Sequence, residues 1–295
     1  MYEEFIYTEE GRRKFLEKFN QKHREAYTII IARSILGRDI DCYRLGTGGR
    51  NIVIVGAHHG MEYISGAVAY DLISFLIEKS TRGAVFCGVN VEILLQMFTF
   101  WIIPCLNPDG VELCTNGISK TPLYDRQVRM NGASLDFSDW QANARGVDLN
   151  HNYAEGFLEY KAIEREENIS AGKTRFSGEY PESEPEVRGM ANFVRTVMPD
   201  AVISLHTQGG EIFSSPKEGR TARIAERLAD TVGYAASYPT AHAAYGGLCD
   251  YTGGRLGIPS FTVELGRGKN PLPHEAYPAL CDTARKLLFT LCKCI

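Results

Sequence analysis

Apolar runs and amphipathic stretches alternate along most of the chain. The runs with the length and composition of buried strands are 51–57, 91–95, 99–103, 201–205 and 259–265. Apolar positions recur at helical spacing over 62–79, 184–198, 219–232 and 275–292. Such alternation is typical of an α/β fold, so we expect a mixed, mostly parallel twisted sheet with helices on both faces.

Three regions depart from this alternation. Residues 1–25 look like a charged helical lead-in, because Phe15, Leu16 and Phe19 share one helix face. The stretches 27–32 and 40–45 are predicted to pair as an edge hairpin. Residues 106–181 are polar and poorly periodic, and a stretch of that length inside a compact domain is usually functional.

Composition narrows the classes of protein. The 295 residues show no repeat or linker, which predicts a single domain over 1–295. A net charge of −4 with interspersed signs makes nucleic acid and anionic membrane unexpected partners. No apolar run reaches the roughly 20 residues that span a bilayer, and the acidic start lacks an export signal. Eight scattered cysteines without a C-x-x-C pair then predict reduced thiols in a cytoplasmic protein.

The stretch from His59 to Glu62 carries the first candidate chemistry. It follows the apolar run 51–57 and opens the predicted helix 62–79. Residues three apart on a first helical turn share one face, so this imidazole and carboxylate can converge on one tetrahedral zinc ion. The alternative is a polar helix start, in which Glu62 favours the helix dipole and His59 caps a strand end.

Two more side chains are expected at the same edge of the sheet. His206 ends the strand 201–205 and Glu264 lies near the end of the strand 259–265. Ligands of open parallel sheets bind at the carboxyl ends of strands. Each residue has a structural alternative: His206 could be a histidine that only ends a strand, and Glu264 could be the partner in a buried ion pair. Finding all four groups on one edge favours a catalytic metal site, with His58 beside it in a supporting or structural role.

The order of these motifs resembles the carboxypeptidase A-like zinc metallopeptidases. The matching segments are His59-x-x-Glu62, Gly146-Val-Asp-Leu-Asn150, Ser204-Leu-His206 and Phe261-Thr-Val-Glu264, within roughly residues 35–290. Within that family, segments 144–153, 182–186, 206–209 and 264–273 resemble the bacterial γ-D-glutamyl-L-diamino-acid endopeptidases. Those enzymes cut cell-wall peptides between D-Glu and diaminopimelate.

The resemblance assigns roles to these residues. His59, Glu62 and His206 would hold one zinc ion per chain, with water in the fourth position. Glu264 would be the general base, and Asn150, with Asp148, would line the substrate pocket. A carboxylate bonded to a ligand histidine is expected to fix that ring's tautomer.

Departures from the family bear on the substrate. His151 stands where the family has an arginine that clamps a terminal carboxylate, and histidine cannot make that two-pronged contact. His242 stands at the place of the catalytic tyrosine, with Tyr245 close enough to substitute. Gln141 occupies the place of the transition-state arginine, which leaves Arg129 and Arg145 as nearby candidates. A side-chain carboxylate of the substrate suits His151 better than an ordinary peptide C-terminus.

The sequence therefore predicts a zinc peptidase acting on small γ-D-glutamyl-diaminopimelate peptides. A zinc deacylase of N-acyl amino acids, with the same ligand set on a related fold, is the second possibility. A metal-free binding module is the third, and the presence of all three ligands and the base disfavours it. Oligomeric state leaves no signal in the sequence.

Overall fold

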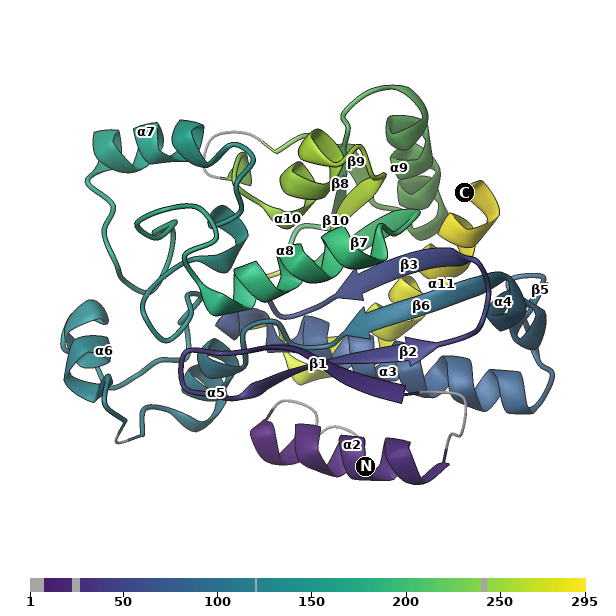
Figure 1. Cartoon of the computed structure of the whole chain (residues 1–295), viewed down its shortest axis with the longest axis horizontal. Helices are drawn as coiled ribbons and strands as arrows, with labels where there is room; N and C mark the ends of the chain where they lie inside the picture. The colour runs from purple at the N-terminus through teal and green to yellow at the C-terminus, as the bar shows by residue number, and fades with distance from the viewer. Residues whose placement is uncertain (1–7, 23–26, 120, 240–242) are drawn as a thin grey trace.

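The computed structural model describes residues 8–22, 27–119, 121–239 and 243–295. Their main element is one eight-stranded sheet with helices on both sides (Figure 1). The strands are β1 (Tyr27–Arg33), β2 (Asp39–Leu45), β3 (Arg50–Val55), β6 (Phe98–Ile103), β7 (Ala201–His206), β8 (Glu211–Ser215), β9 (Ala235–Ser237) and β10 (Ser260–Glu264). A separate small hairpin pairs β4 (Val85–Phe86) with β5 (Val89–Asn90).

The strand order is β1-β2-β6-β3-β7-β10-β8-β9. The central strands β6, β3, β7 and β10 run parallel, as do β8 and β9. The β1–β2, β2–β6 and β8–β10 pairs are antiparallel. The predicted mixed, mostly parallel sheet and its edge hairpin are thus confirmed.

The helices are α2 (Glu9–Lys22), α3 (Tyr63–Thr81), α4 (Val91–Met97), α5 (Pro108–Asn116), α6 (Tyr124–Met130), α7 (Phe157–Glu167), α8 (Pro185–Val197), α9 (Gly219–Val232), α10 (Leu248–Asp250) and α11 (Tyr277–Cys294). Short turns η1 (Gly60–Glu62), η2 (Leu149–His151), η4 (Tyr251–Arg255) and η5 (His274–Ala276) accompany them. Figure 1 shows α8 in front of the sheet, with α3 and α11 behind it.

Burial on both faces of the central strands explains this layering. In β3, Ile52 and Ile54 join the core beneath α3, α9 and α11. Val53 and Val55 point the other way and join the core beneath α8. Successive strand residues alternate between faces, so a continuous apolar run is the pattern expected of a strand covered on both sides.

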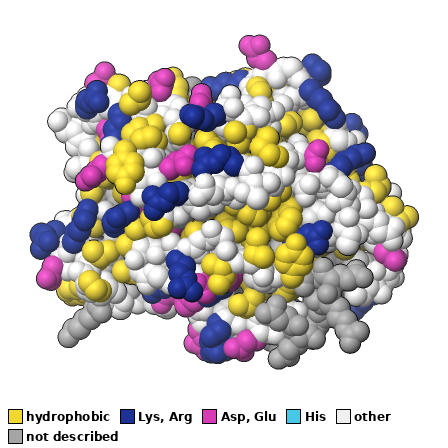
Figure 2. Space-filling model, viewed as in Figure 1, with side chains coloured by type: hydrophobic (Ala, Val, Ile, Leu, Met, Phe, Trp, Pro, Cys, Tyr) yellow, Lys and Arg dark blue, Asp and Glu magenta, His cyan; other side chains and the backbone are white. Residues whose placement is uncertain are grey.

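Helix α3 has the length and apolar composition that could cross a membrane, and 72% of its most apolar window is buried inside the molecule. That burial is the behaviour of a core helix. On the face of the molecule in Figure 2, Lys and Arg are interspersed with Asp and Glu. All eight cysteines are free thiols.

The prediction of a strand at 91–95 was wrong. These residues begin helix α4, in which Val91 and Leu94 are buried and lie three apart. The Asn90 side chain accepts a hydrogen bond of 3.1 Å from the Ile93 N–H and so caps the first turn. A short apolar run fits a strand and a buried helical turn equally, and the cap decides between them here.

The segment 106–181 is more structured than its composition predicts. It contains α5, α6, η2 and α7, joined by loops that form one wall of the cavity described below. Strands β8 and β9 were also missed. Strand β8 follows two glycines, Gly209 and Gly210, and its five residues, three of them polar, lack the apolar run that marks a central strand. The lead-in predicted over 1–25 contains helix α2, and its two ends, 1–7 and 23–25, lie outside the described residues.

Candidate active site

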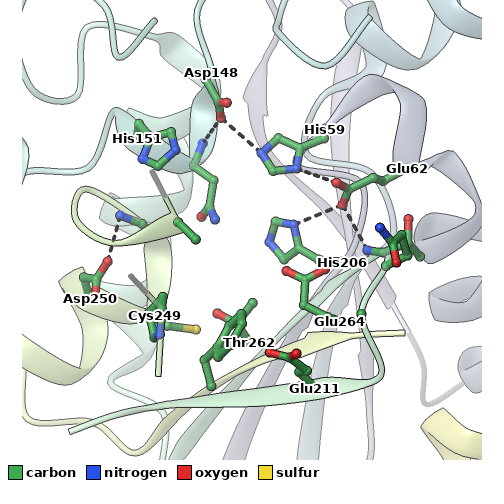
Figure 3. Close-up of a pocket in the computed structure, with 18 of the residues that line it drawn as sticks. His59, Glu62, Asp148, His151, His206, Glu211, Cys249, Asp250, Thr262 and Glu264 are labelled. Atoms are coloured by element: carbon green, nitrogen blue, oxygen red, sulfur yellow. Dashed lines mark hydrogen bonds and ion pairs between the residues drawn. The ribbon is translucent and has the colours of Figure 1, made fainter. Parts of the chain in front are cut away.

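Three buried side chains converge where β3 and β7 end. His59 follows β3, Glu62 closes the η1 turn, and His206 is the last residue of β7. The two carboxylate oxygens of Glu62 lie 2.9 Å from His59 Nδ1 and 3.1 Å from His206 Nδ1 (Figure 3). Their ligating atoms all lie within 4.8 Å of one another, which is close enough to surround one metal ion.

The far side of the His59 ring is held by Asp148. His59 Nε2 lies 3.0 Å from Asp148 Oδ1, which also accepts a hydrogen bond of 3.1 Å from the Asn150 N–H. The second Asp148 oxygen accepts one of 3.2 Å from the Arg175 N–H. A carboxylate on Nε2 leaves Nδ1 free to bind metal as a lone-pair donor. The predicted carboxylate on a ligand histidine is therefore Asp148.

A buried chain of hydrogen bonds orients His206 in the same way. Its Nε2 lies 3.0 Å from Ser204 Oγ, which in turn lies 3.4 Å from His58 Nδ1. His58 Nε2 lies 3.1 Å from the Tyr153 hydroxyl. Burial and the neighbouring imidazoles hold the pKa of His58 well below its usual value, so this ring stays neutral. His58 thus supports the site, as expected, and does not join the converging donors.

The charges of His59 and Glu62 depend on each other. Burial alone would raise the pKa of Glu62, but the imidazoles of His59 and His206 lower it to about 2. Burial disfavours protonated His59, yet Glu62 and Asp148 hold its pKa well above the usual value. A cation between the two rings would take over the role of that proton. The arrangement therefore suits a bound metal ion.

Glu264 lies beside this group, at the end of β10. Its register partner on the parallel neighbour β7 is His206. Both residues line a cavity of about 430 Å³ with His59 and Glu62. Burial and the carboxylates Glu62 and Glu211 hold the pKa of Glu264 well above its usual value. A carboxyl group with this surrounding is suited to exchange protons near neutral pH.

Asn150 and His151 also line the cavity. The buried His151 ring stacks on Tyr160 at a centroid distance of 3.7 Å. Its Nδ1 donates a hydrogen bond of 2.8 Å to the Tyr245 carbonyl. Burial lowers the pKa of His151, although Asp148 opposes the shift, so the ring is mostly neutral at pH 7. One face of this imidazole and its Nδ1 are therefore occupied by the protein itself.

The structure does not bring the remaining candidates into the cavity. The Arg145 guanidinium lies 3.0 Å from Glu184 and lines a separate pocket of about 160 Å³. Tyr245 contributes its carbonyl to His151, whereas its side chain is 44% exposed and outside the lining. Arg129 is exposed on α6. His242 lies outside the described residues.

Four charged side chains of the cavity were not foreseen, namely Arg175, Glu211, Lys217 and Asp250. Glu211 would have been found only by recognising β8. Arg175 comes from the loop after α7, and its backbone has a positive φ of 67°, which is unusual for a side chain of this size. Nothing in the local sequence distinguishes it from a surface arginine.

The site defines a class of protein before any comparison is made. Two imidazoles and a carboxylate are the donor set of catalytic zinc sites that keep one position open. Here both imidazoles are oriented by partners on their far nitrogens, and the cavity leads directly to the donors. These residues fit a zinc ion, and the adjacent Glu264 is positioned for hydrolysis at a metal-dependent site.

Comparison with known proteins places the chain in a family. The zinc carboxypeptidase family matches residues 13–285, so this chain belongs to that family and is a zinc-dependent peptidase. γ-D-glutamyl-L-diamino acid endopeptidase 1 of Lysinibacillus sphaericus is 29% identical over 275 residues, which are 90% of this chain and 67% of that protein.

Solved structures agree on the fold. Bovine thrombin-activatable fibrinolysis inhibitor superposes with a TM-score of 0.76 at 21% identity, covering 99% of this chain and 97% of that one. Murein-tripeptide amidase MpaA from Escherichia coli O157 superposes with a TM-score of 0.53 at 21% identity, covering 88% of this chain and 91% of that one. The predicted zinc carboxypeptidase-like fold is confirmed.

Proposed function

We propose that this zinc peptidase hydrolyses the amide bond between γ-D-glutamate and diaminopimelate in small muropeptides. The observation that carries the reaction type is Glu264, which is held in register with His206 and lines one cavity together with His59, Glu62 and His206. The substrate class is supported by the name of the Lysinibacillus relative, which the chain matches over most of its length.

In this proposal His59, Glu62 and His206 hold the zinc ion through His59 Nδ1, the Glu62 carboxylate and His206 Nδ1. Asp148 and Ser204 hold the far nitrogens of the two rings, which keeps the two inward nitrogens as lone-pair donors. Zinc bound there supplies a Lewis acid for the scissile carbonyl and lowers the pKa of the attacking water.

The proton transfers fall to Glu264. As the water attacks the carbonyl carbon, a Glu264 oxygen takes its proton, and the same carboxyl group then gives that proton to the leaving amine. Its buried position and its carboxylate neighbours raise its proton affinity, which favours the first transfer. The products are a free γ-carboxylate of D-glutamate and a free amine of diaminopimelate.

The cavity also suits a substrate with several charges. Besides the groups around the donors, it is lined by the cations Arg175 and Lys217 and by the carboxylates Glu211 and Asp250. The Arg175 guanidinium pairs with Glu167 at 3.0 Å, and the two side chains are 40% and 38% exposed. Exposed pairs of this kind contribute little, so Arg175 can turn to a substrate carboxylate at low cost.

The test is hydrolysis of synthetic peptides by the zinc-loaded protein. The panel holds L-Ala-γ-D-Glu-meso-diaminopimelate, its α-linked isomer, its L-lysine analogue and N-acetyl-aspartate, with zinc-loaded Glu264→Gln as the control. We expect release of meso-diaminopimelate from the first peptide and little turnover of the others. Preferential hydrolysis of N-acetyl-aspartate would instead favour the deacylase alternative, and turnover of the α-linked isomer would favour an ordinary carboxypeptidase.

A further inference from the structure

Glu211 is a cavity carboxylate that the reaction described above does not use. It is the first residue of β8, and its antiparallel register partner on β10 is the general base Glu264. Directly opposed residues of neighbouring strands point to the same face of a sheet. Figure 3 shows the two side chains next to each other at the cavity, and both belong to its lining.

Apart from Glu264, the other cavity carboxylates have partners within the described part of the chain. Glu62 faces two imidazoles, Asp148 accepts from His59 and two backbone N–H groups, and Asp250 accepts from the Gly247 N–H. Among the described residues, Glu211 has neither a hydrogen bond nor an ion pair to its carboxylate. It is half-buried, so water compensates its charge only in part.

The space over Glu211 is kept open by Gly209. A Cβ atom at position 209 would lie 3.2 Å from the Glu264 Cβ and 3.8 Å from the Glu211 Cγ. Any longer side chain there would extend over both carboxylates. The glycine therefore leaves the surface between the general base and Glu211 accessible from the cavity.

We propose that Glu211 binds a primary ammonium group of the substrate and is a specificity-determining residue of this enzyme. A half-buried carboxylate next to a second carboxylate is poorly compensated, and a charge-assisted bond to an ammonium group relieves that cost. The inference rests on the proposed function for the identity of the substrate. In a muropeptide the ammonium group comes either from the N-terminal amine on the acyl side or from the far end of diaminopimelate.

Binding of reaction products tests this without requiring turnover. Titration calorimetry on zinc-loaded protein would compare L-Ala-γ-D-Glu with its N-acetyl form, and meso-diaminopimelate with L-2-aminopimelate, which lacks only the distal amine. We expect one ammonium ligand to bind about tenfold more tightly than its matched partner. The pair that shows the difference identifies the source of the ammonium group.

The variants assign that difference to Glu211. In Glu211→Gln the two ligands of the discriminated pair should bind with affinities within about twofold of each other. In Glu211→Asp part of the wild-type affinity ratio should be kept. Glu226→Gln is the matched control, because it removes the same charge from an exposed position on α9 and should leave the ratio unchanged. Zinc content and the unfolding temperature of each variant are measured alongside, so that a misfolded variant is recognised. If Glu211→Gln misfolds, the affinity ratios of the wild type and of Glu211→Asp test the inference instead.

Three results would overturn the inference. The first is that the wild type binds both members of each ligand pair with equal affinity. The second is an unchanged affinity ratio in Glu211→Gln, and the third is an equal loss of affinity in that variant for both members of a pair. The last result would assign Glu211 to proton transfer or to structure. If muropeptides are not hydrolysed but the ratio behaves as expected, the proposed function fails and the ammonium site stands.

Discussion

At the scale of single residues, the general base can be separated from the metal-binding groups. Glu264 lines the cavity without belonging to the converging donors. Glu264→Gln keeps the side-chain volume but cannot accept the proton, so kcat should fall by ~10²–10⁴ while zinc stays bound. Steady-state kinetics and metal analysis on the same sample check this. Activity within a few-fold of wild type would remove Glu264 from the mechanism, and loss of zinc would make it a ligand.

His151 gives a prediction about pH. If protonated His151 held a substrate carboxylate, KM would rise as pH climbs through the pKa of that ring. Burial lowers that pKa, so the charged form is lost below the usual value of about 6.5. We therefore expect KM for the muropeptide to be flat from pH 7 to 9 and to change only in more acidic solution. A KM transition centred above pH 7 that disappears in His151→Gln would contradict this.

At the scale of elements, the η1 turn positions two of the three metal-binding residues, and Gly60 sets its place. A Cβ atom on Gly60 would lie 2.5 Å from the Gly110 carbonyl oxygen and 2.7 Å from that of Trp140. Backbone atoms cannot move aside easily, so Gly60→Ala should shift η1 together with His59 and Glu62. We expect weaker zinc binding and at least tenfold lower kcat/KM, because displacements near 1 Å are costly in active sites.

Gly49→Ala is the control for that variant, because nothing lies within 4 Å of a Cβ atom built there. It should keep wild-type zinc affinity and activity. Competition with a chelator of known affinity measures zinc affinity, and muropeptide kinetics measure activity. Zinc affinity equal to wild type in Gly60→Ala would show that η1 tolerates displacement, against the argument from close packing.

The elements also show what the sequence could predict. Strand ends were predictable because β3 and β7 carry apolar runs and β10 places Phe261 and Val263 in the core, and three of the four central residues follow or end such a strand. Strand β8 is second from the edge of the sheet and three of its five residues are polar, and α4 depends on a cap at Asn90, so neither has a distinctive apolar pattern. Glu211 reaches the cavity through β8, and Arg175 reaches it through the loop after α7, which has no apolar periodicity either.

At the scale of the whole molecule, a buried carboxyl far from the proposed chemistry should shape the pH dependence of stability. Glu186 on α8 is fully buried, and its Oε2 has no hydrogen-bond partner among the described residues. Its Oε1 accepts a hydrogen bond of 3.2 Å from the Ile35 N–H. Burial, aided by Glu184 and Asp109, raises the pKa of Glu186 to about 8.

The sign of the effect follows from that shift. The folded state binds the proton more tightly than the unfolded state, so the contribution of Glu186 is complete below pH 4.5 and is lost as pH rises to about 8. Glu186→Gln imitates the protonated form, so its free energy of unfolding relative to wild type should increase over that range, by up to ~1.4 kcal/mol per pH unit. Urea unfolding at several pH values measures the difference, and a constant difference would mean that Glu186 is ionised in the fold.

The central claim is that His59, Glu62 and His206 together hold the catalytic zinc ion, and the most direct test is the zinc content of protein purified without chelator. We expect about one zinc per chain in the wild type and in Glu264→Gln. In His206→Ala the content should fall below roughly a tenth, even after zinc is added back, while circular dichroism shows the fold retained. A wild type that binds no zinc, or a His206→Ala variant that keeps a full equivalent, would contradict the account.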